Sequence, residues 1–245
     1  MKNLVILGAG TAGTMMGNHL VSKLPKKEWK IHIIDQYKTH YYQPGFLFLP
    51  FDIYTENQVK KVGEKFIPKG VNYIQQRIEK IDTENKLVEL NNGTLVYDIL
   101  IIATGSKIAP DEVEGMLSKE WQKSVFDFYT YEGALALRNK LRDFKSGKLV
   151  VHITEMPIKC PVAPLEFAFL ADSYFKKKGI RDKVEITYVT PLSGAFTKEF
   201  CSKSLGYLLE EKDIKLVTDF AIEKVDFENN KIIDYIDTEV DYDLL

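Results

Sequence analysis

The feature that most constrains the fold is a glycine-rich turn near the N-terminus. Gly8-Ala9-Gly10-Thr11-Ala12-Gly13 has the pattern GxGxxG and lies between the apolar run 3–7 and a predicted helix at 13–24. The first glycine permits a tight turn, the second lets a pyrophosphate approach the backbone, and the third lets helix and strand pack closely. Asp35 ends a second predicted strand, 30–35, where a carboxylate accepts hydrogen bonds from a ribose. This pattern predicts a dinucleotide-binding unit, and a glycine turn without a ligand is the alternative.

The rest of the first unit and a second α/β unit follow along the chain. Residues 55–69 are predicted to be helical. A β-meander is predicted at 71–98, with a turn at Asn92-Gly93, before the apolar strand 99–105. Beyond these the predicted order is a helix capped by Thr130, strand 148–154, helix 164–178, strand 184–190, helix 198–211, strand 214–217 and a hairpin joined by Asn229-Asn230. The sequence therefore predicts an α/β fold of two tandem Rossmann-like units.

Charge and hydropathy exclude some functions and partners. The net charge is −2 and lysines alternate with acidic residues, so we expect no nucleic-acid partner. No uninterrupted apolar stretch approaches the roughly 20 residues of a membrane span. The chain runs from Met1 directly into a strand-like segment without a cleavable leader, so we expect a cytoplasmic protein.

Two cysteines distant in sequence do not form a disulfide framework, which leaves redox or catalytic chemistry for them.

The turn after the strand 148–154 differs from the first one. It contains no glycine between residues 155 and 166, and its prolines would obstruct the close approach of a pyrophosphate. We therefore expect no nicotinamide cofactor there. Cys160 follows Lys159 and precedes a helix that begins near Pro164, and both neighbours favour the reactive thiolate. A buried structural cysteine in a proline-stiffened loop is the alternative.

Two segments resemble a known family. Lys-Cys-Pro-Val-Ala-Pro-Leu-Glu (159–166) resembles the redox-cysteine loop of sulfide:quinone oxidoreductases and of the flavin subunit of flavocytochrome c sulfide dehydrogenases. His40-Tyr41-Tyr42-Gln43-Pro44 resembles the aromatic stretch that these families place near the flavin, although an aromatic turn that fills a core would look the same. The order of elements is similar to that of the two-dinucleotide flavoprotein (disulfide reductase) superfamily, in which the N-terminal glycine loop holds FAD.

The resemblance implies a mechanism. In that family a cysteine at the Cys160 position lies on one face of the isoalloxazine and pairs with a second cysteine from the C-terminal third. Sulfide attack on this disulfide gives a persulfide, and two electrons pass through FAD to a membrane quinone. Glu166 matches a glutamate that acts there as the proton acceptor. For Glu166 the alternative is an acid in the first turn of a helix, favoured by the helix dipole.

The resemblance also implies contacts and partners. Besides the catalytic pair Cys160 and Glu166, we expect no metal site. The expected FAD-binding residues are Gly8, Ala9, Gly10, Thr11, Ala12, Gly13, Asp35, Gln36, Gln43, Pro44, Ile78, Ala103, Thr104 and Gly105. The expected partners are sulfide, a quinone, the inner face of the cell membrane as a peripheral contact, and a second copy of the chain.

The predicted domains are an FAD-binding domain at 1–107, a second Rossmann-like domain with the redox cysteine at 108–238, and the start of a return to the FAD domain at 239–245. Family members continue beyond this point, so we expect this chain to lack the C-terminal part of the fold and to be catalytically incomplete. Cys201 does not match the partner cysteine and is interpreted as structural. Two alternatives remain. A type II NADH:quinone dehydrogenase would require glycines at 155–165, and a non-catalytic FAD-binding relative would need only the first glycine loop.

Overall fold

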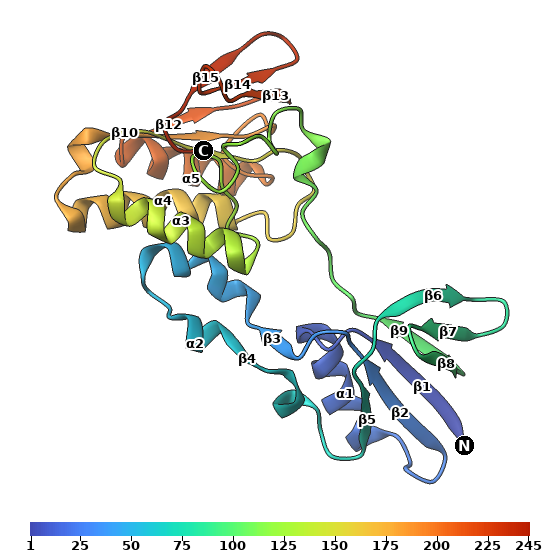
Figure 1. The fold of residues 1–245 in the computed structure, drawn as a ribbon. Coiled ribbons are helices and arrows are strands. Elements are labelled where there is room, and N and C mark those ends of the chain that lie inside the picture. Colours follow the sequence, from blue (N-terminus) through green and yellow to red (C-terminus); the bar gives the residue numbers. More distant parts are fainter. The chain divides into compact units, whose positions relative to one another are not determined.

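The computed structural model describes residues 1–245, which form two compact units. Unit 1 contains Met1–Gln43 and Thr55–Lys107, and unit 2 contains Pro44–Tyr54 and Ile108–Leu245. Each unit is built around its own parallel sheet (Figure 1). None of the helices combines the length and the apolar character needed to cross a bilayer.

The sheet of unit 1 has the strand order β5-β2-β1-β9, and its neighbouring strands are parallel. Its strands are β1 (Lys2–Leu7), β2 (Trp29–Ile34), β5 (Val71–Ile74) and β9 (Ile99–Ile102). Helix α1 (Thr11–Lys23) connects β1 to β2. The apolar runs of β1 and β2 are buried on both faces, because α1 covers one side and the antiparallel meander packs on the other. The predicted first βαβ unit is confirmed.

The meander is shorter than predicted. It consists of β6 (Ile78–Asp82), β7 (Leu87–Leu90) and β8 (Gly93–Val96), paired antiparallel. Residues 71–74, predicted to belong to it, instead form β5 and pair with β2 in the parallel sheet. A short strand with partly buried residues carries no local signal for which sheet it joins, since pairing is decided by contacts distant in sequence.

The predicted helix at 55–69 is wrong. This segment forms one helical turn, α2 (Glu56–Val59), then strand β4 (Lys60–Val62) and a 3-10 turn (Gly63–Phe66). Thr55 and Gln58 make a capping box that begins the turn. Helix α2 ends there because β4 pairs antiparallel with β3 (Thr39–Tyr41). Two further 3-10 turns, Gln43–Leu47 and Leu49–Phe51, follow β3.

Unit 2 repeats the strand–helix–strand order. Its parallel sheet contains β10 (Gly147–His152), β11 (Val184–Val189) and β12 (Ile214–Val217). The helices are α3 (Tyr131–Asp143), α4 (Ala163–Lys178) and α5 (Glu199–Glu211), and two 3-10 turns lie at Pro110–Glu112 and Arg181–Lys183. As predicted, Thr130 caps α3, because its side chain accepts a hydrogen bond from Gly133 N. The predicted second Rossmann-like unit is confirmed.

The C-terminal strands belong to unit 2. The predicted hairpin is formed by β13 (Ile222–Asp226) and β14 (Lys231–Asp234), and β15 (Glu239–Asp241) adds a third antiparallel strand. Residues 239–245, predicted to begin a return to the first domain, stay in unit 2: Leu244 is buried and forms a parallel bridge with Leu149 of β10.

The segment Pro44–Tyr54 lies outside the unit that surrounds it in sequence. Phe51 packs against Phe167 of α4, with ring centroids 4.9 Å apart, and Asp52 forms an ion pair with Arg142 of α3 at 2.5 Å. These contacts attach the segment to unit 2 although it falls within the predicted FAD-binding domain. That domain was defined by its ligand and not by its packing, so its boundary stays a prediction.

Burial of His152 makes the stability of unit 2 dependent on pH. Its Nε2 is buried without a hydrogen-bond partner, its ring meets Phe220 edge to face, and burial lowers its pKa to about 3 from 6.5. As pH falls from 6.5 towards 3, the unfolded chain takes up a proton that the folded chain does not. The unfolding free energy therefore falls by about 1.4 kcal/mol per pH unit in this range.

We predict that His152→Phe removes this contribution, so the stability lost between pH 7 and pH 5 becomes about 2 kcal/mol smaller than in the parent. The measurement is urea unfolding at both pH values, followed by Trp121 fluorescence in a Trp29→Phe background. An identical loss in parent and variant would mean that His152 does not stay neutral in the folded state.

Candidate functional site

The glycine loop of unit 1 brings α1 into direct contact with the end of β1. Gly8 has φ +97°, and a Cβ there would lie 2.4 Å from the Ala103 carbonyl oxygen. A Cβ on Gly13 would lie 1.9 Å from the Gly8 carbonyl oxygen. Larger residues would therefore force helix, loop and strand apart. Gly8 thus permits the tight turn and Gly13 the close packing of helix and strand, as the sequence predicts.

The middle of the loop remains open. A Cβ on Gly10 would meet no atom within 4 Å, and Gly10, Thr11 and Ala12 are exposed. The N-terminus of α1 has neither a side-chain cap nor an acidic residue in its first turn. Its backbone N–H groups and positive dipole end are therefore available to an anion. This arrangement fits the pyrophosphate of a dinucleotide.

Asp35 fastens the loop to the end of β2. One carboxylate oxygen accepts a hydrogen bond from Ala9 N at 2.7 Å, and the other accepts one from Tyr37 N at 2.8 Å. Each oxygen retains a free lone pair, and the side chain is only half-buried, so it can still accept a hydrogen bond from a ribose. Gln36 beside it is exposed.

One contact of this loop was not predicted. His40 Nδ1 lies 3.0 Å from the Ala9 carbonyl oxygen, and the His40 ring packs on Phe66 at 4.3 Å. The aromatic segment 40–44 had been assigned to the site, but no sequence pattern indicated that its first residue would hold the glycine loop.

The other predicted cofactor residues lie in three places. Ala103, Thr104 and Gly105 follow β9 and lie beside the glycine loop, where Ala103 N donates to the Leu7 carbonyl. Ile78 begins the meander, and its side chain packs in the meander core. Gln43 and Pro44 are exposed where the chain passes from unit 1 to unit 2. Within unit 1, the structure thus gathers Gly8–Gly13, Asp35 and Ala103–Gly105 at one end of the sheet.

The turn between β10 and α4, the crossover of unit 2, contains no glycine and carries the Cys160 thiol. Cys160 is exposed, and its backbone is left-handed, with φ +58°. For a residue with a side chain this conformation costs roughly 1–2 kcal/mol, so the surrounding contacts must hold it. Its carbonyl oxygen accepts hydrogen bonds from Ala163 N and from the Tyr129 hydroxyl, both at 3.1 Å. Helix α4 begins at Ala163 without a side-chain cap. The thiol therefore lies just ahead of a helix N-terminus that no side chain caps.

Glu166 lies in the first turn of α4 and is exposed. A carboxylate at a helix N-terminus is stabilised by the dipole, and exposure leaves it accessible to a proton donor. Tyr129 connects the two residues: burial raises the pKa of its hydroxyl, and negative charge on Cys160 and on Glu166 raises it further. The Tyr129 hydroxyl is thus hydrogen-bonded to the Cys160 backbone and lies within electrostatic range of the Glu166 carboxylate. Tyr129 was missed in the sequence because it stands far upstream of the loop and matches no motif.

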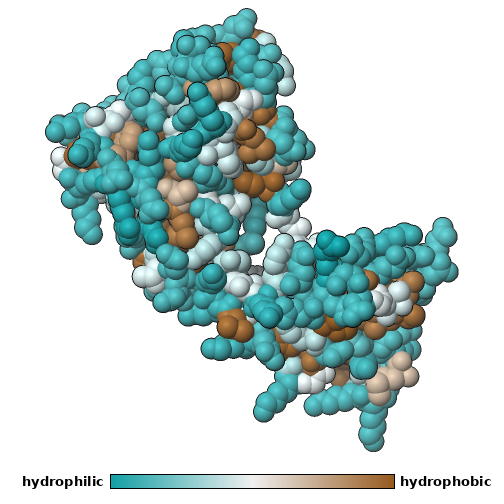
Figure 2. Space-filling view, viewed as in Figure 1, coloured by the Kyte–Doolittle hydropathy of each residue, from teal (hydrophilic) through white to brown (hydrophobic).

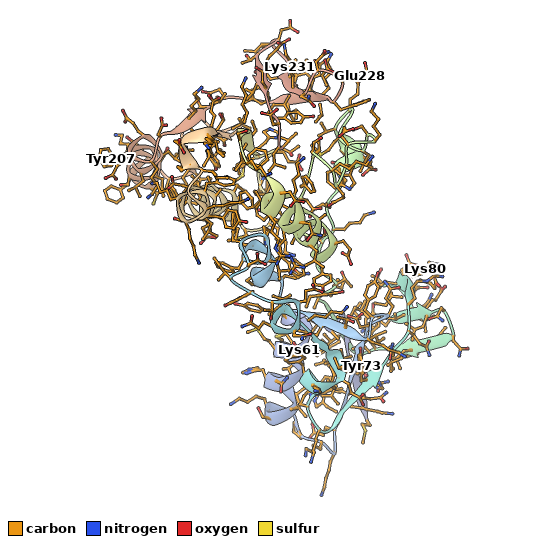
Figure 3. The ribbon with its side chains drawn as sticks, turned by 60° about the vertical axis from the view of Figure 1, so that its left-hand side comes forward. Lys61, Tyr73, Lys80, Tyr207, Glu228 and Lys231 are labelled. Carbon is orange, nitrogen blue, oxygen red and sulfur yellow. The ribbon has the colours of Figure 1, made fainter.

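Cys201 has no role in the core. It is a free thiol on the exposed side of α5, next to the largely exposed Phe200. Its interpretation as structural stays a prediction. On the same helix Tyr207 also extends away from the sheet (Figure 3). Elsewhere hydrophilic residues dominate the visible surface (Figure 2).

Comparison with known proteins gives a consistent result. The family model "Pyridine nucleotide-disulphide oxidoreductase" matches residues 2–245. A mitochondrial sulfide:quinone oxidoreductase of Dictyostelium discoideum is 26% identical over 216 residues, which are 87% of this chain and 48% of that protein. The crystal structure of a sulfide:quinone oxidoreductase from Aquifex aeolicus superposes with a TM-score of 0.83 at 24% identity, covering 100% of this chain and 57% of that one. A type II NADH:quinone oxidoreductase of Staphylococcus aureus is 30% identical, but over only 49% of this chain and 30% of that protein.

We predict that Gly13→Ala destabilises unit 1 by about 1–3 kcal/mol, because its methyl group has no room beside the Gly8 carbonyl. Gly10→Ala is the matched control and should change the unfolding free energy by less than about 1 kcal/mol, because its methyl group enters open space. Denaturant unfolding followed by Trp29 in a Trp121→Phe background measures both. Equal effects of the two variants would contradict the close packing at Gly13.

Proposed function

The chain belongs to the pyridine nucleotide-disulphide oxidoreductase family, and on that premise we propose that it forms the cofactor- and thiol-bearing part of a sulfide:quinone oxidoreductase. The chain spans about half the length of the relatives it matches, 48% in one case. The activity of the whole protein is therefore proposed here from the residues that this half contains.

The observation that carries the proposal is the Cys160 crossover. At the position where a second nucleotide site would need glycines, the chain has prolines and an exposed thiol held in a left-handed backbone. This thiol lies ahead of the N-terminus of α4, which has no side-chain cap and carries the exposed Glu166 carboxylate in its first turn. An exposed thiol on the same turn–helix segment as a carboxylate that can accept a proton suits the transfer of a sulfur atom.

The proposed step forms one S–S bond. Cys160 thiolate and hydrosulfide together give a Cys160 persulfide and release two electrons, so that Cys–S⁻ and HS⁻ become Cys–S–SH. Glu166 accepts the proton when neutral hydrogen sulfide is the species that arrives. Cys160 then holds the sulfur as the outer atom of its persulfide.

Family membership implies a flavin-type cofactor, and we propose FAD bound at the glycine loop of unit 1. Bound there, FAD would supply the two-electron acceptor between the thiol and a quinone. The uncapped N-terminus of α1 and the open space at Gly10 support the position of its pyrophosphate. Asp35 would hold the ribose, with Gln36, Gln43, Pro44, Ile78 and Ala103–Gly105 as the remaining proposed contacts.

We further propose the partners that follow from this reaction. The electron acceptor is a quinone, and the site of action is the inner face of the cell membrane, reached by a peripheral contact. A second copy of the chain is proposed as an additional partner.

NADH:quinone oxidoreduction is the second candidate, favoured by the partial match to the Staphylococcus aureus protein. It would need a turn that admits a pyrophosphate after β10. The three prolines and the missing glycines of the crossover weigh against it.

We predict that anaerobic sulfide bleaches the visible absorption of the bound flavin and that NADH, added in a parallel cuvette, does not. In Cys160→Ser the flavin should stay bound and bleaching should be lost, because the hydroxyl cannot accept sulfur. Cys201→Ser is the matched control and should bleach like the parent. Bleaching by NADH alone would overturn the proposal in favour of the second candidate. A flavin indifferent to both would leave a non-catalytic relative or a catalytically incomplete chain.

We predict that Gly10→Val weakens FAD binding by roughly tenfold or more, the equivalent of about 1.4 kcal/mol, because the isopropyl group fills the space proposed for the pyrophosphate. Isothermal titration of flavin-free protein with FAD measures the affinity, and the unfolding midpoint should stay near that of the parent. Undiminished affinity would move the FAD site away from this loop.

A further inference from the structure

Tyr129 reaches the Cys160 loop from a distant part of unit 2. Its hydroxyl donates a hydrogen bond to the Cys160 carbonyl oxygen at 3.1 Å. The same oxygen accepts a hydrogen bond from Ala163 N, the first residue of α4. Two donors thus converge on the carbonyl of the one loop residue whose backbone is left-handed. Only one of them, the Tyr129 hydroxyl, comes from outside the loop.

Tyr129 is held rigidly before it meets the loop. Its backbone N–H donates to the Asp127 carboxylate at 2.9 Å, and the same carboxylate accepts hydrogen bonds from Thr130 N and Thr130 Oγ1. Its ring packs on Phe128 at 5.1 Å, and Phe128 stacks on Phe167 of α4 at 4.7 Å. The start of α3 and an aromatic stack therefore fix the direction of the hydroxyl.

The hydroxyl remains a donor under ordinary conditions. Burial, together with negative charge on Cys160 and Glu166, raises the pKa of Tyr129. A tyrosine whose pKa is raised keeps its proton at neutral pH, so it does not act as a base there. Its hydrogen bond to the carbonyl of Cys160 is consequently present whenever the thiol reacts.

We propose that Tyr129 is the positioning residue of the Cys160 thiol. Its hydroxyl holds the Cys160 carbonyl, which keeps the residue left-handed and its thiol exposed ahead of α4. The inference rests on the proposed function only for the reaction that the thiol performs; the positioning itself is a property of unit 2. Tyr129 thus orients the reactive sulfur although it lies in a part of the chain that carries no recognisable motif.

The test is Tyr129→Phe, which removes the hydroxyl and keeps the ring and its stacking. Alkylation of the whole chain by iodoacetamide is followed at both cysteines by peptide mass spectrometry, so that Cys201 serves as an internal standard. We expect the rate at Cys160 relative to Cys201 to fall about fivefold, the effect of losing one ordinary hydrogen bond. Amide hydrogen exchange in residues 158–163 should rise by a similar factor.

Tyr174→Phe is the matched control, because Tyr174 belongs to the same aromatic region through Phe51 and has no hydrogen bond to the loop. It should leave the relative rate at Cys160 and the exchange of the loop unchanged. A purely packing role for Tyr129 predicts parental rates in Tyr129→Phe, and that result would overturn the inference. So would a fall of the same size in Tyr174→Phe.

The outcome is separable from that of the proposed function. If alkylation at Cys160 slows in Tyr129→Phe while sulfide bleaches no flavin in the parent, the positioning role stands and the proposed function fails. If the parent bleaches with sulfide and alkylation is unaffected by Tyr129→Phe, the positioning role fails alone.

Discussion

The contact between Gly13 and the Gly8 carbonyl is the constraint on which unit 1 depends. Only because neither residue has a side chain can α1 begin directly against the end of β1. That closeness leaves the first N–H groups of α1 uncapped and facing an open loop. Asp35 and His40 then hold Ala9 from two sides, through its N–H and its carbonyl. A site for an anion follows from the packing of a helix on a strand.

Unit 2 uses the same order of elements for a different purpose. The turn between β10 and α4 is stiffened by prolines, and the left-handed residue is a cysteine instead of a glycine. The uncapped helix N-terminus faces an open glycine loop in unit 1 and follows an exposed thiol in unit 2. The same order of strand, turn and helix thus carries an open glycine loop in unit 1 and an exposed thiol in unit 2.

The sequence predicted features that depend on local chemistry. The glycine loop, the Thr130 cap and the start of α4 after Cys160 each follow from residues a few positions apart, and Asp35 follows from its place at the end of the second strand of the same motif. The errors arose where distant contacts decide the structure. Residues 60–62 form a strand because β3 is available to pair with them, and 71–74 join the parallel sheet through β2. For the same reason the hydrogen bond from Tyr129 to Cys160, which joins residues 31 positions apart, could not be foreseen.

The attachment of Pro44–Tyr54 to unit 2 has a consequence for biosynthesis. Leu47 and Phe51 of this segment are buried among residues of α3 and α4, which the ribosome makes much later. At roughly 5–20 residues per second, the segment waits several seconds for those helices. During that time its apolar side chains have no native partner, so the nascent chain presents a surface that a chaperone would recognise. The earliest-made part of the core of unit 2 therefore stays uncovered until α3 and α4 have been made.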